Sequence, residues 1–318
     1  IVDMFSLQFV QGNYHPLTIL SLALDYAIDG TNPMVYHITN LIFHLLNSIL
    51  VYVFVVKLFR NNPLAFWVSL LFAIHPMHLE SFAWVSERKD VLYVFFFILG
   101  LMQYLNYLKS ERKIDYLWCF LFFLLSLLSK GMAVVFPVVL LLMDYLKKRK
   151  FNRKVILEKV PLFVFSLIFG LIVLWAQKDS NAISSNEAHP LSQAILIPIH
   201  GLLLYIIKFI VPYNLSALHP YPMIIDEQMP ATITYSFIPL SIIFIVIIKF
   251  FKNDRKVLFG LGFFVLVIFP VLQFLSVGSA MISERFTYLP YIGLFLMTGV
   301  MLDQAYKKGT AIKKKIII

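Results

Sequence analysis

Long apolar runs recur along the whole chain and leave too little polar sequence to cover a water-soluble surface. Sixty per cent of the 318 residues are hydrophobic and 14% are charged, whereas a soluble domain carries about 25% charged residues. The mean hydropathy is +0.83. The sequence therefore excludes an ordinary soluble enzyme and predicts a polytopic membrane protein.

The apolar runs predict an all-α transmembrane helix bundle. Only helices and closed barrels satisfy every backbone polar group inside lipid, and these runs are too long and continuous for barrel strands. Segments 16–28 and 194–213 are expected to be interfacial or re-entrant helices on the outer face, with one ordinary crossing as the alternative for 194–213. About nine full spans are expected, over residues 36–59, 64–78, 90–108, 116–129, 132–146, 160–176, 234–251, 257–276 and 289–305.

The basic residues divide unequally between two sets of loops. Because Lys and Arg are retained on the cytoplasmic side, the loops that, together with the adjacent Lys57, hold 21 of the 27 basic residues are predicted to be cytoplasmic: 60–63, 109–115, 147–159, 249–256 and 306–315. The external loops are then 79–89, 177–193, 214–233 and 277–288. This distribution explains the net charge of +10 without nucleic-acid binding.

Four of the remaining six basic residues lie at predicted external turns, against the charge bias: Arg88, Lys89, Lys130 and Arg285. Cations at one membrane face are suited to a lipid phosphate or diphosphate. We therefore predict that these residues bind a donor phosphate, and that Arg88, Lys130 and Arg285 converge around it because their mutual repulsion requires an anion. The alternative is that each long side chain reaches the interface independently.

Several histidines and acids complete the predicted polar sites. His75, His78 and Glu80 lie in one external segment. A divalent cation is one alternative there, but the spacing matches no standard metal motif, so acid–base or head-group contact is favoured. Glu284 is predicted either to hold its neighbour Arg285 in place or to cancel its charge.

One face of the first long apolar segment is polar, with steps of three, four and three residues between His37, Asn40, His44 and Asn47. This spacing places the four side chains on one face of a helix. We expect that face to contact protein or a cavity rather than lipid. It forms either the wall of a substrate cavity or a set of interhelical hydrogen bonds.

Five stretches resemble membrane proteins from bacteria that are related to the transmembrane and tetratricopeptide-repeat (TMTC) family, within the GT-C glycosyltransferases. They are NYHPLTILSLALDY (13–26), FAIHPMHLESFAWVSERKDVL (72–92), LLSKGMAVVFPVVLLLMDYL (127–146), VPYNLSALHPYP (211–222) and MISERFTYLPYIGLF (281–295).

The resemblance implies that residues 1–318 are a GT-C-like transmembrane module, truncated at both ends, with tetratricopeptide repeats beyond residue 318. It implies a polyprenyl-phosphate-linked sugar donor, and an acceptor protein (through a hydroxyl) or glycan, on the external face of the bacterial inner membrane, in contact with membrane lipids. His15 is predicted to line the cavity, but many relatives have Arg at its position and Gly131 also departs from the family pattern, so the family's donor contacts are not transferred to these two positions.

The resemblance also implies a catalytic Asp before the stretch that begins at Asn13. Asp3 has no matching acidic neighbour, so the catalytic Asp is expected upstream of residue 1, and Glu80 is the candidate within the chain. A transporter of lipid head groups or polysaccharide is the alternative function, and a non-catalytic membrane scaffold is another.

Overall fold

Helices make up almost the whole of the protein that the structure describes. The structure, a computed structural model, describes residues 9–10, 12–180, 191–221, 229–274 and 280–316. Asp3 lies outside these residues, as do parts of the predicted external loops 177–193, 214–233 and 277–288. The helical architecture agrees with the predicted all-α class.

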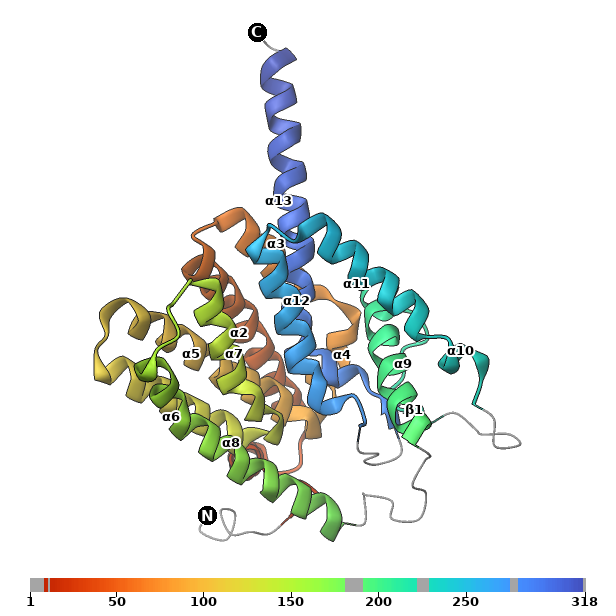
Figure 1. The fold of residues 1–318 in the computed structure, drawn as a ribbon. Coiled ribbons are helices and arrows are strands. Elements are labelled where there is room, and N and C mark those ends of the chain that lie inside the picture. The colour runs from red at the N-terminus through yellow and green to blue at the C-terminus, as the bar shows by residue number, and fades with distance from the viewer. Residues whose placement is uncertain (1–8, 11, 181–190, 222–228, 275–279, 317–318) are drawn as a thin grey trace.

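Figure 1 shows how the α-helices are arranged. In chain order they are α1 (Pro16–Asp29), α2 (Pro33–Phe59), α3 (Asn62–Ile74), α4 (Leu79–Ala83), α5 (Arg88–Ser110), α6 (Lys113–Ser129), α7 (Phe136–Leu146), α8 (Arg153–Asp179), α9 (Leu191–Ile210), α10 (Ala231–Thr234), α11 (Phe237–Phe251), α12 (Arg255–Ile268) and α13 (Tyr291–Ile316).

Short 3-10 turns and one small sheet connect these helices. The turns are η2 (Pro76–His78), η3 (Val85–Glu87), η4 (Gly131–Val135), η5 (Phe269–Val271) and η6 (Glu284–Thr287). Strand β1 (His219–Pro220) pairs antiparallel with β2 (Ala280–Ile282), and His219 lies opposite Ile282. The sheet joins the segment after α9 to the segment before η6.

Asparagine side chains begin three of the long helices. Asn32, Asn61 and Asn152 each accept a hydrogen bond from a backbone N–H in the first turn, of α2, α3 and α8 respectively. These bonds satisfy donors that a helix start leaves unpaired. Pro33 follows the cap of α2 and needs no N–H partner there. Local sequence thus fixes where these helices start.

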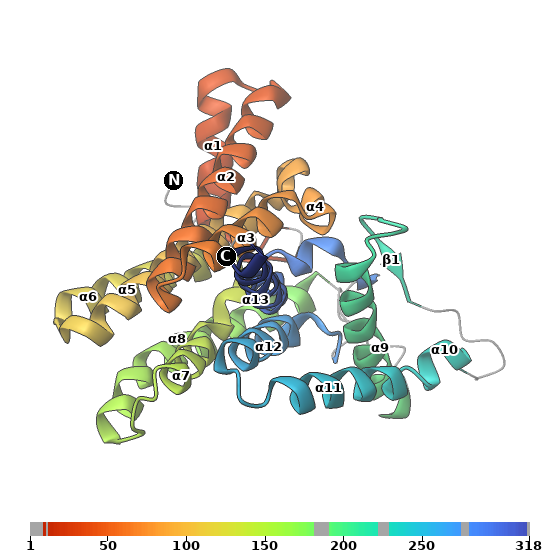
Figure 2. The same cartoon turned by 90° about the horizontal axis from the view of Figure 1, so that it is seen from above.

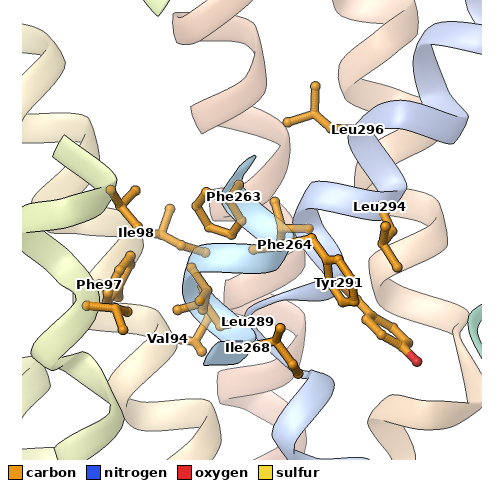
Figure 3. Packing of buried hydrophobic residues seen from close by; sticks show 14 of the residues in the cluster. Val94, Phe97, Ile98, Phe263, Phe264, Ile268, Leu289, Tyr291, Leu294 and Leu296 are labelled. Atoms are coloured by element: carbon orange, nitrogen blue, oxygen red, sulfur yellow. The ribbon is translucent and has the colours of Figure 1, made fainter. Parts of the chain in front are cut away.

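Helix α13 lies at the centre of the bundle. Figure 2 shows it nearly end-on, with α3 and α12 beside it, the pairs α5–α6 and α7–α8 on one side, and α9 and α11 on the other. Glycines let α12 and α13 approach closely, because a Cβ at Gly293 would lie 2.3 Å from the carbonyl oxygen of Gly260. Around this crossing Phe263 and Leu289 lie on the side of Phe97 of α5, and Phe264 lies beside Tyr291 of α13 (Figure 3).

The structure does not support nine full spans. Among the described residues, four helical segments are long and apolar enough to cross a membrane: Pro33–Phe59, Val85–Ser110, Arg153–Asp179 and Ala231–Phe251. Two of the other apolar runs contain a break that hydropathy does not reveal. Run 64–78 is interrupted where Pro76 opens η2, and run 257–276 is interrupted where Pro270 lies in η5. Helices α3 and α12 are consequently 13 and 14 residues long.

Contacts between connecting segments support the predicted division into two sets of loops. Polar contacts join segments in or beside the predicted cytoplasmic loops: Lys57 with Asn106 at 2.9 Å, Lys147 with the Leu58 carbonyl at 2.7 Å, Lys154 with Glu111 at 2.6 Å, and Asn61 with Asp303 at 2.8 Å. The predicted external segments also contact one another. Segments predicted to lie on the same side of the membrane therefore contact one another, and the side on which each set lies stays a prediction.

The segment that follows helix α9 contacts η6, and whether α9 is interfacial, re-entrant or a full crossing stays a prediction. Six residues after its end, the backbone N–H of Ser216 donates to Glu284 of η6, at 2.6 Å. Lys208, in its last turn, donates to the carbonyl oxygens of Tyr213 and Asn214. The chain therefore returns to η6, in the predicted external region, immediately after α9.

Candidate functional site

Carboxylates lie between the cations that were predicted to bind phosphate. The Arg285 guanidinium contacts Glu80 at 2.5 Å and Glu87 at 3.5 Å. Lys89 contacts Glu87 at 3.0 Å. Each cation therefore has an acidic partner within the protein, and mutual repulsion between uncompensated cations is the wrong description of this region.

The ion pair that Lys130 forms is more buried than the ion pairs of Lys89 and Arg285. The Lys130 ammonium contacts Asp90, whose side chain is 0% exposed, while the Lys130 side chain is 11% exposed. The Ser81 hydroxyl also donates to Asp90, at 3.3 Å. The pair joins the start of α5 to the turn between α6 and η4.

Three of the four predicted cations come together, although they are distant in sequence. Lys130 and Arg285 both lie over the ring of Phe286, 5.6 and 5.2 Å from its centroid. Lys89 shares the Glu87 carboxylate with Arg285. Lys89, Lys130 and Arg285 thus form one group around Phe286 and Glu87, which we call the cationic cluster.

Arg88 does not join the cationic cluster. Its side chain is 0% exposed and forms an ion pair with Asp25 of α1 at 2.5 Å. It also donates to Ser21 at 2.8 Å, to the Tyr36 carbonyl at 3.0 Å, and to the Asn40 side chain. The structure therefore places Arg88 between α1, α2 and α5, where its donors are already used.

A cavity of about 570 Å³ opens beside the cationic cluster. Its polar end is lined by His15, Lys89 and Lys130. Its apolar wall comes largely from α8 and η5: Leu167, Gly170, Leu171, Val173, Leu174, Phe269, Pro270 and Val271. We call this space the main cavity. It combines two basic side chains at one end with a long apolar wall, which suits an amphipathic anion.

His15 is held in the uncharged state at the polar end of the main cavity. Burial, followed by the charge of Lys89, lowers the pKa of His15 from 6.5 to about 4; Lys130 acts in the same direction and Glu87 opposes it. Its buried Nδ1 atom has no hydrogen-bond partner among the residues that the structure describes. A neutral imidazole here can accept a proton from a bound group or donate one to it.

Three of the four residues on the polar face of α2 are buried, which confirms that part of the prediction. His44 Nδ1 is hydrogen-bonded to the Tyr288 hydroxyl at 2.8 Å, and the Asn47 amide donates to the Val91 carbonyl at 2.8 Å. Asn40 is also buried. These contacts favour interhelical hydrogen bonding over the wall of a substrate cavity.

His37 is exposed, so the prediction is wrong for this residue. It lies in the first turns of α2, which project from the bundle together with α1 (Figure 2). Packing there comes from the neighbouring positions, since Tyr36 donates to the Gly30 carbonyl and Thr39 donates to Asp25. The helical spacing is correct, but the protein beside it does not extend to this turn.

The His75–Glu80 segment uses its polar groups for internal contacts. His75 Nε2 is hydrogen-bonded to the Phe209 carbonyl at 3.1 Å, and His78 Nδ1 to the Phe72 carbonyl at 2.9 Å. Glu80 instead pairs with Arg285. Within the described part of the chain, no group of three or more His, Cys, Asp or Glu side chains is placed to hold a metal ion.

Glu284 does not hold Arg285. The turn η6 directs the two neighbouring side chains to different partners: Arg285 contacts Glu80 of α4, and Glu284 accepts from Ser216. His219 Nε2 lies 3.6 Å from the Glu284 carboxylate. Glu284 therefore anchors the segment that follows α9, and Glu80 anchors Arg285.

Sequence reasoning missed a second buried charge cluster at the other end of α8. Lys159 contacts Asp144 at 2.7 Å, and Arg149 contacts Glu158 at 2.6 Å. The Tyr104 hydroxyl donates to Asp144 at 2.6 Å. Asp144 lies in an otherwise apolar run, and an acid in such a run is the signal from which this cluster was predictable.

The chain is similar to several protein O-mannosyl-transferases. It is 39% identical to "Protein O-mannosyl-transferase TMTC3" of Homo sapiens over 92 residues, which are 29% of this chain and 10% of that protein. It is 40% identical to "Protein O-mannosyl-transferase TMTC1" of Mus musculus over 104 residues, 32% of this chain and 10% of that protein. These relatives support the resemblance to the TMTC family over about 30% of the chain.

A longer similarity is weaker in identity. The chain is 25% identical to "Protein O-mannosyl-transferase F38B6.6" of Caenorhabditis elegans over 306 residues, 92% of this chain and 42% of that protein. The chain thus spans about a tenth to two fifths of the length of these relatives. No family model matches the chain, and no solved structure matches it. At the level of the family, the relatives support a membrane glycosyltransferase.

Proposed function

We propose that this chain is the transmembrane part of a GT-C-type glycosyltransferase that moves a sugar from a polyprenyl-phosphate-linked donor to a protein hydroxyl. The names of the relatives favour mannose as the sugar. In this proposal the enzyme spans the bacterial inner membrane, the cationic cluster faces the external side, and tetratricopeptide repeats follow residue 318.

The main cavity is the observation that carries the proposal. A polyprenyl phosphate is an anion attached to a long apolar chain, and the cavity offers Lys89 and Lys130 at one end and the apolar side of α8 along its length. Charge-assisted hydrogen bonds from ammonium groups to phosphate are stronger than neutral ones. The phosphate is therefore placed against Lys89 and Lys130, and the first part of the tail against Leu171 and Leu174.

The proposed chemistry requires a leaving group and a base. As the bond between sugar and phosphate breaks, negative charge grows on the departing phosphate, and Lys89 and Lys130 stabilise that charge. Arg285 holds the cluster together through Glu80 and Glu87. A general base must take the proton of the acceptor hydroxyl. We assign this role to an Asp upstream of residue 1.

Glu80 is the other acid proposed for the base. Burial raises its pKa, while the nearby Arg285 acts in the opposite direction. Both of its oxygens already accept hydrogen bonds from Arg285, one from the backbone N–H at 2.8 Å and one from the guanidinium at 2.5 Å. This double contact favours a role for Glu80 in positioning Arg285.

The test measures sugar transfer by the full-length protein in nanodiscs, with mannosyl-phosphoryl-undecaprenol as donor and a Ser/Thr-rich peptide as acceptor. Lys89→Gln removes a cation from the main cavity and leaves Glu87 paired with Arg285. We expect the KM for donor to rise roughly tenfold, because a hydrogen bond to a charged group is worth about 1.5–3 kcal/mol.

Lys57→Gln is the matched control, since Lys57 lies in the predicted cytoplasmic region, bonded to Asn106. The proposal fails if Lys89→Gln and Lys57→Gln give the same donor KM. Movement of the donor across the membrane of proteoliposomes, without sugar transfer, would instead favour a transporter. Absence of both activities would favour a scaffold.

A further inference from the structure

A second groove continues along α8 beyond the main cavity. It has a volume of about 470 Å³ and lies between α7 and α8, which run side by side in Figures 1 and 2. Its lining residues are Leu141, Phe151, Ile156, Lys159, Val160, Phe163, Val164 and Leu167. Leu167 lines both this distal groove and the main cavity.

The distal groove has no cation available for an anionic ligand. Among the described residues that line it, Lys159 alone is charged, and the Lys159 ammonium lies 2.7 Å from Asp144 and 2.6 Å from the Tyr104 hydroxyl. The side chain is 2% exposed. Lys159 therefore contributes methylene groups to the groove while its charge is neutralised inside the protein. The occupant must be apolar where it contacts these residues.

Successive turns of α8 connect the two spaces. Ser166, Leu167 and Gly170 line the main cavity, and Phe163 and Val164 line the distal groove one turn earlier. A Cβ built on Gly170 would meet no heavy atom within 4 Å, so the surface is open at this position. From Ile156 to Gln177 the lining residues extend over about 30 Å of helix, at about 1.5 Å per residue.

We propose that the distal groove binds the far part of the donor's isoprenoid tail, so that the enzyme selects donors by chain length. This inference rests on the proposed function, which places the phosphate at Lys89 and Lys130. A tail that starts there and follows α8 reaches the distal groove at Leu167. A short tail ends inside the main cavity and gains nothing from the groove.

The experiment compares geranyl and undecaprenyl phosphates in two assays on the full-length protein in nanodiscs. The first assay uses an undecaprenyl phosphate that carries a photoreactive diazirine at the far end of its tail. It maps the residues to which this diazirine crosslinks. This assay requires no sugar transfer. We expect crosslinks within residues 156–167, and their suppression by much lower concentrations of unlabelled undecaprenyl phosphate than of geranyl phosphate, because both share the phosphate site but only the longer tail reaches the distal groove.

The second assay compares the KM values of the two mannosyl-phosphoryl donors. In the parent protein, the undecaprenyl donor should have a KM lower by roughly tenfold or more, because each buried methylene contributes to affinity. Val164→Trp fills the distal groove and should remove this preference without changing the KM of the geranyl donor. Ile168→Trp is the matched control, since Ile168 is 44% exposed, close to the 47% of Val164, and lines neither space.

The outcomes separate the two proposals. Sugar transfer with equal KM values for both tails would overturn the chain-length inference and leave the proposed function standing. Crosslinking within residues 156–167 without sugar transfer would support tail binding and contradict the transferase. A diazirine phospholipid that crosslinks there and is not displaced by undecaprenyl phosphate would assign the groove to bilayer lipid and overturn the inference.

Discussion

The ion pair between Lys130 and Asp90 allows the structural and functional roles of the cationic cluster to be separated. Lys130→Met removes the ammonium and leaves the Asp90 carboxylate, which is 0% exposed, with the Ser81 hydroxyl as its remaining hydrogen-bond donor. One hydroxyl is a poor substitute for a cation at a buried carboxylate. We therefore expect Lys130→Met to destabilise the protein strongly.

The expected loss of unfolding free energy depends on how deeply each partner of the ion pair is buried. Removing one partner of a buried ion pair costs about 3–5 kcal/mol of unfolding free energy, and the complete burial of Asp90 puts Lys130→Met in that range. Asp90→Asn should cost less, about 1–2 kcal/mol, because Lys130 is 11% exposed and borders the main cavity. The double variant Lys130→Met/Asp90→Asn leaves no unpaired charge and should recover most of the stability.

The assay combines unfolding with sugar transfer. Unfolding in detergent micelles can be followed by the fluorescence of the four Trp residues, and donor KM is measured for each variant that folds. We expect the double variant to be nearly as stable as the parent protein but to bind donor more weakly, because its lysine is absent. A Lys130→Met variant as stable as the parent would refute the buried ion pair. Normal donor KM in the stable double variant would remove Lys130 from the donor site.

Three further predictions concern other positions. Arg88→Leu should lower the unfolding free energy by about 3–5 kcal/mol, because it leaves the buried Asp25 carboxylate without its cation. Arg88→Lys keeps the charge and should lower the unfolding free energy less. Thermal melts of the two variants measure the difference. The folded-state pKa of His15, about 4, lies below its ordinary value of 6.5, so the unfolded state binds more protons between these values. Stability should therefore be complete above pH 6.5 and decrease by about 3 kcal/mol towards pH 4, and His15→Gln should flatten that part of a pH series of melts. Cysteines introduced at Ser110 and at Ser185, the latter outside the described residues, should be labelled from opposite sides of the membrane. The native Cys119 is buried and free. Labelling of both introduced cysteines from one side would refute the topology.

Helical periodicity predicted side-chain environment better than hydropathy predicted spans. The three-four spacing correctly places Asn40, His44 and Asn47 in the protein interior, because a helix face is a local property of the sequence. Apolar content alone does not show that Pro76 ends a run as a 3-10 turn. The exposed His37 has a different origin, since burial depends on how far the neighbouring helices extend.

The charge bias located unusual cations but did not identify their partners. Arg88 and Asp25 are 63 residues apart and meet only because α1 folds back against α2 and α5. Glu284 is adjacent to Arg285 in sequence, yet Arg285 pairs with Glu80, 205 residues away. Partner choice among charges is set by tertiary packing, which a single sequence does not show.

The acidic partners change the physical basis of phosphate binding at the main cavity. Three cations there are matched by three carboxylates: Lys89, Lys130 and Arg285 by Glu80, Glu87 and Asp90. Relief of repulsion therefore cannot supply the affinity. A lysine ammonium has three N–H donors, and Lys130 uses one of them for Asp90. A phosphate can bind to the remaining donors of Lys89 and Lys130 without displacing a carboxylate. Because the headgroup then binds to a nearly neutral cluster, a substantial share of the affinity must come from the apolar tail along α8, and donor binding should depend less on salt than on tail length.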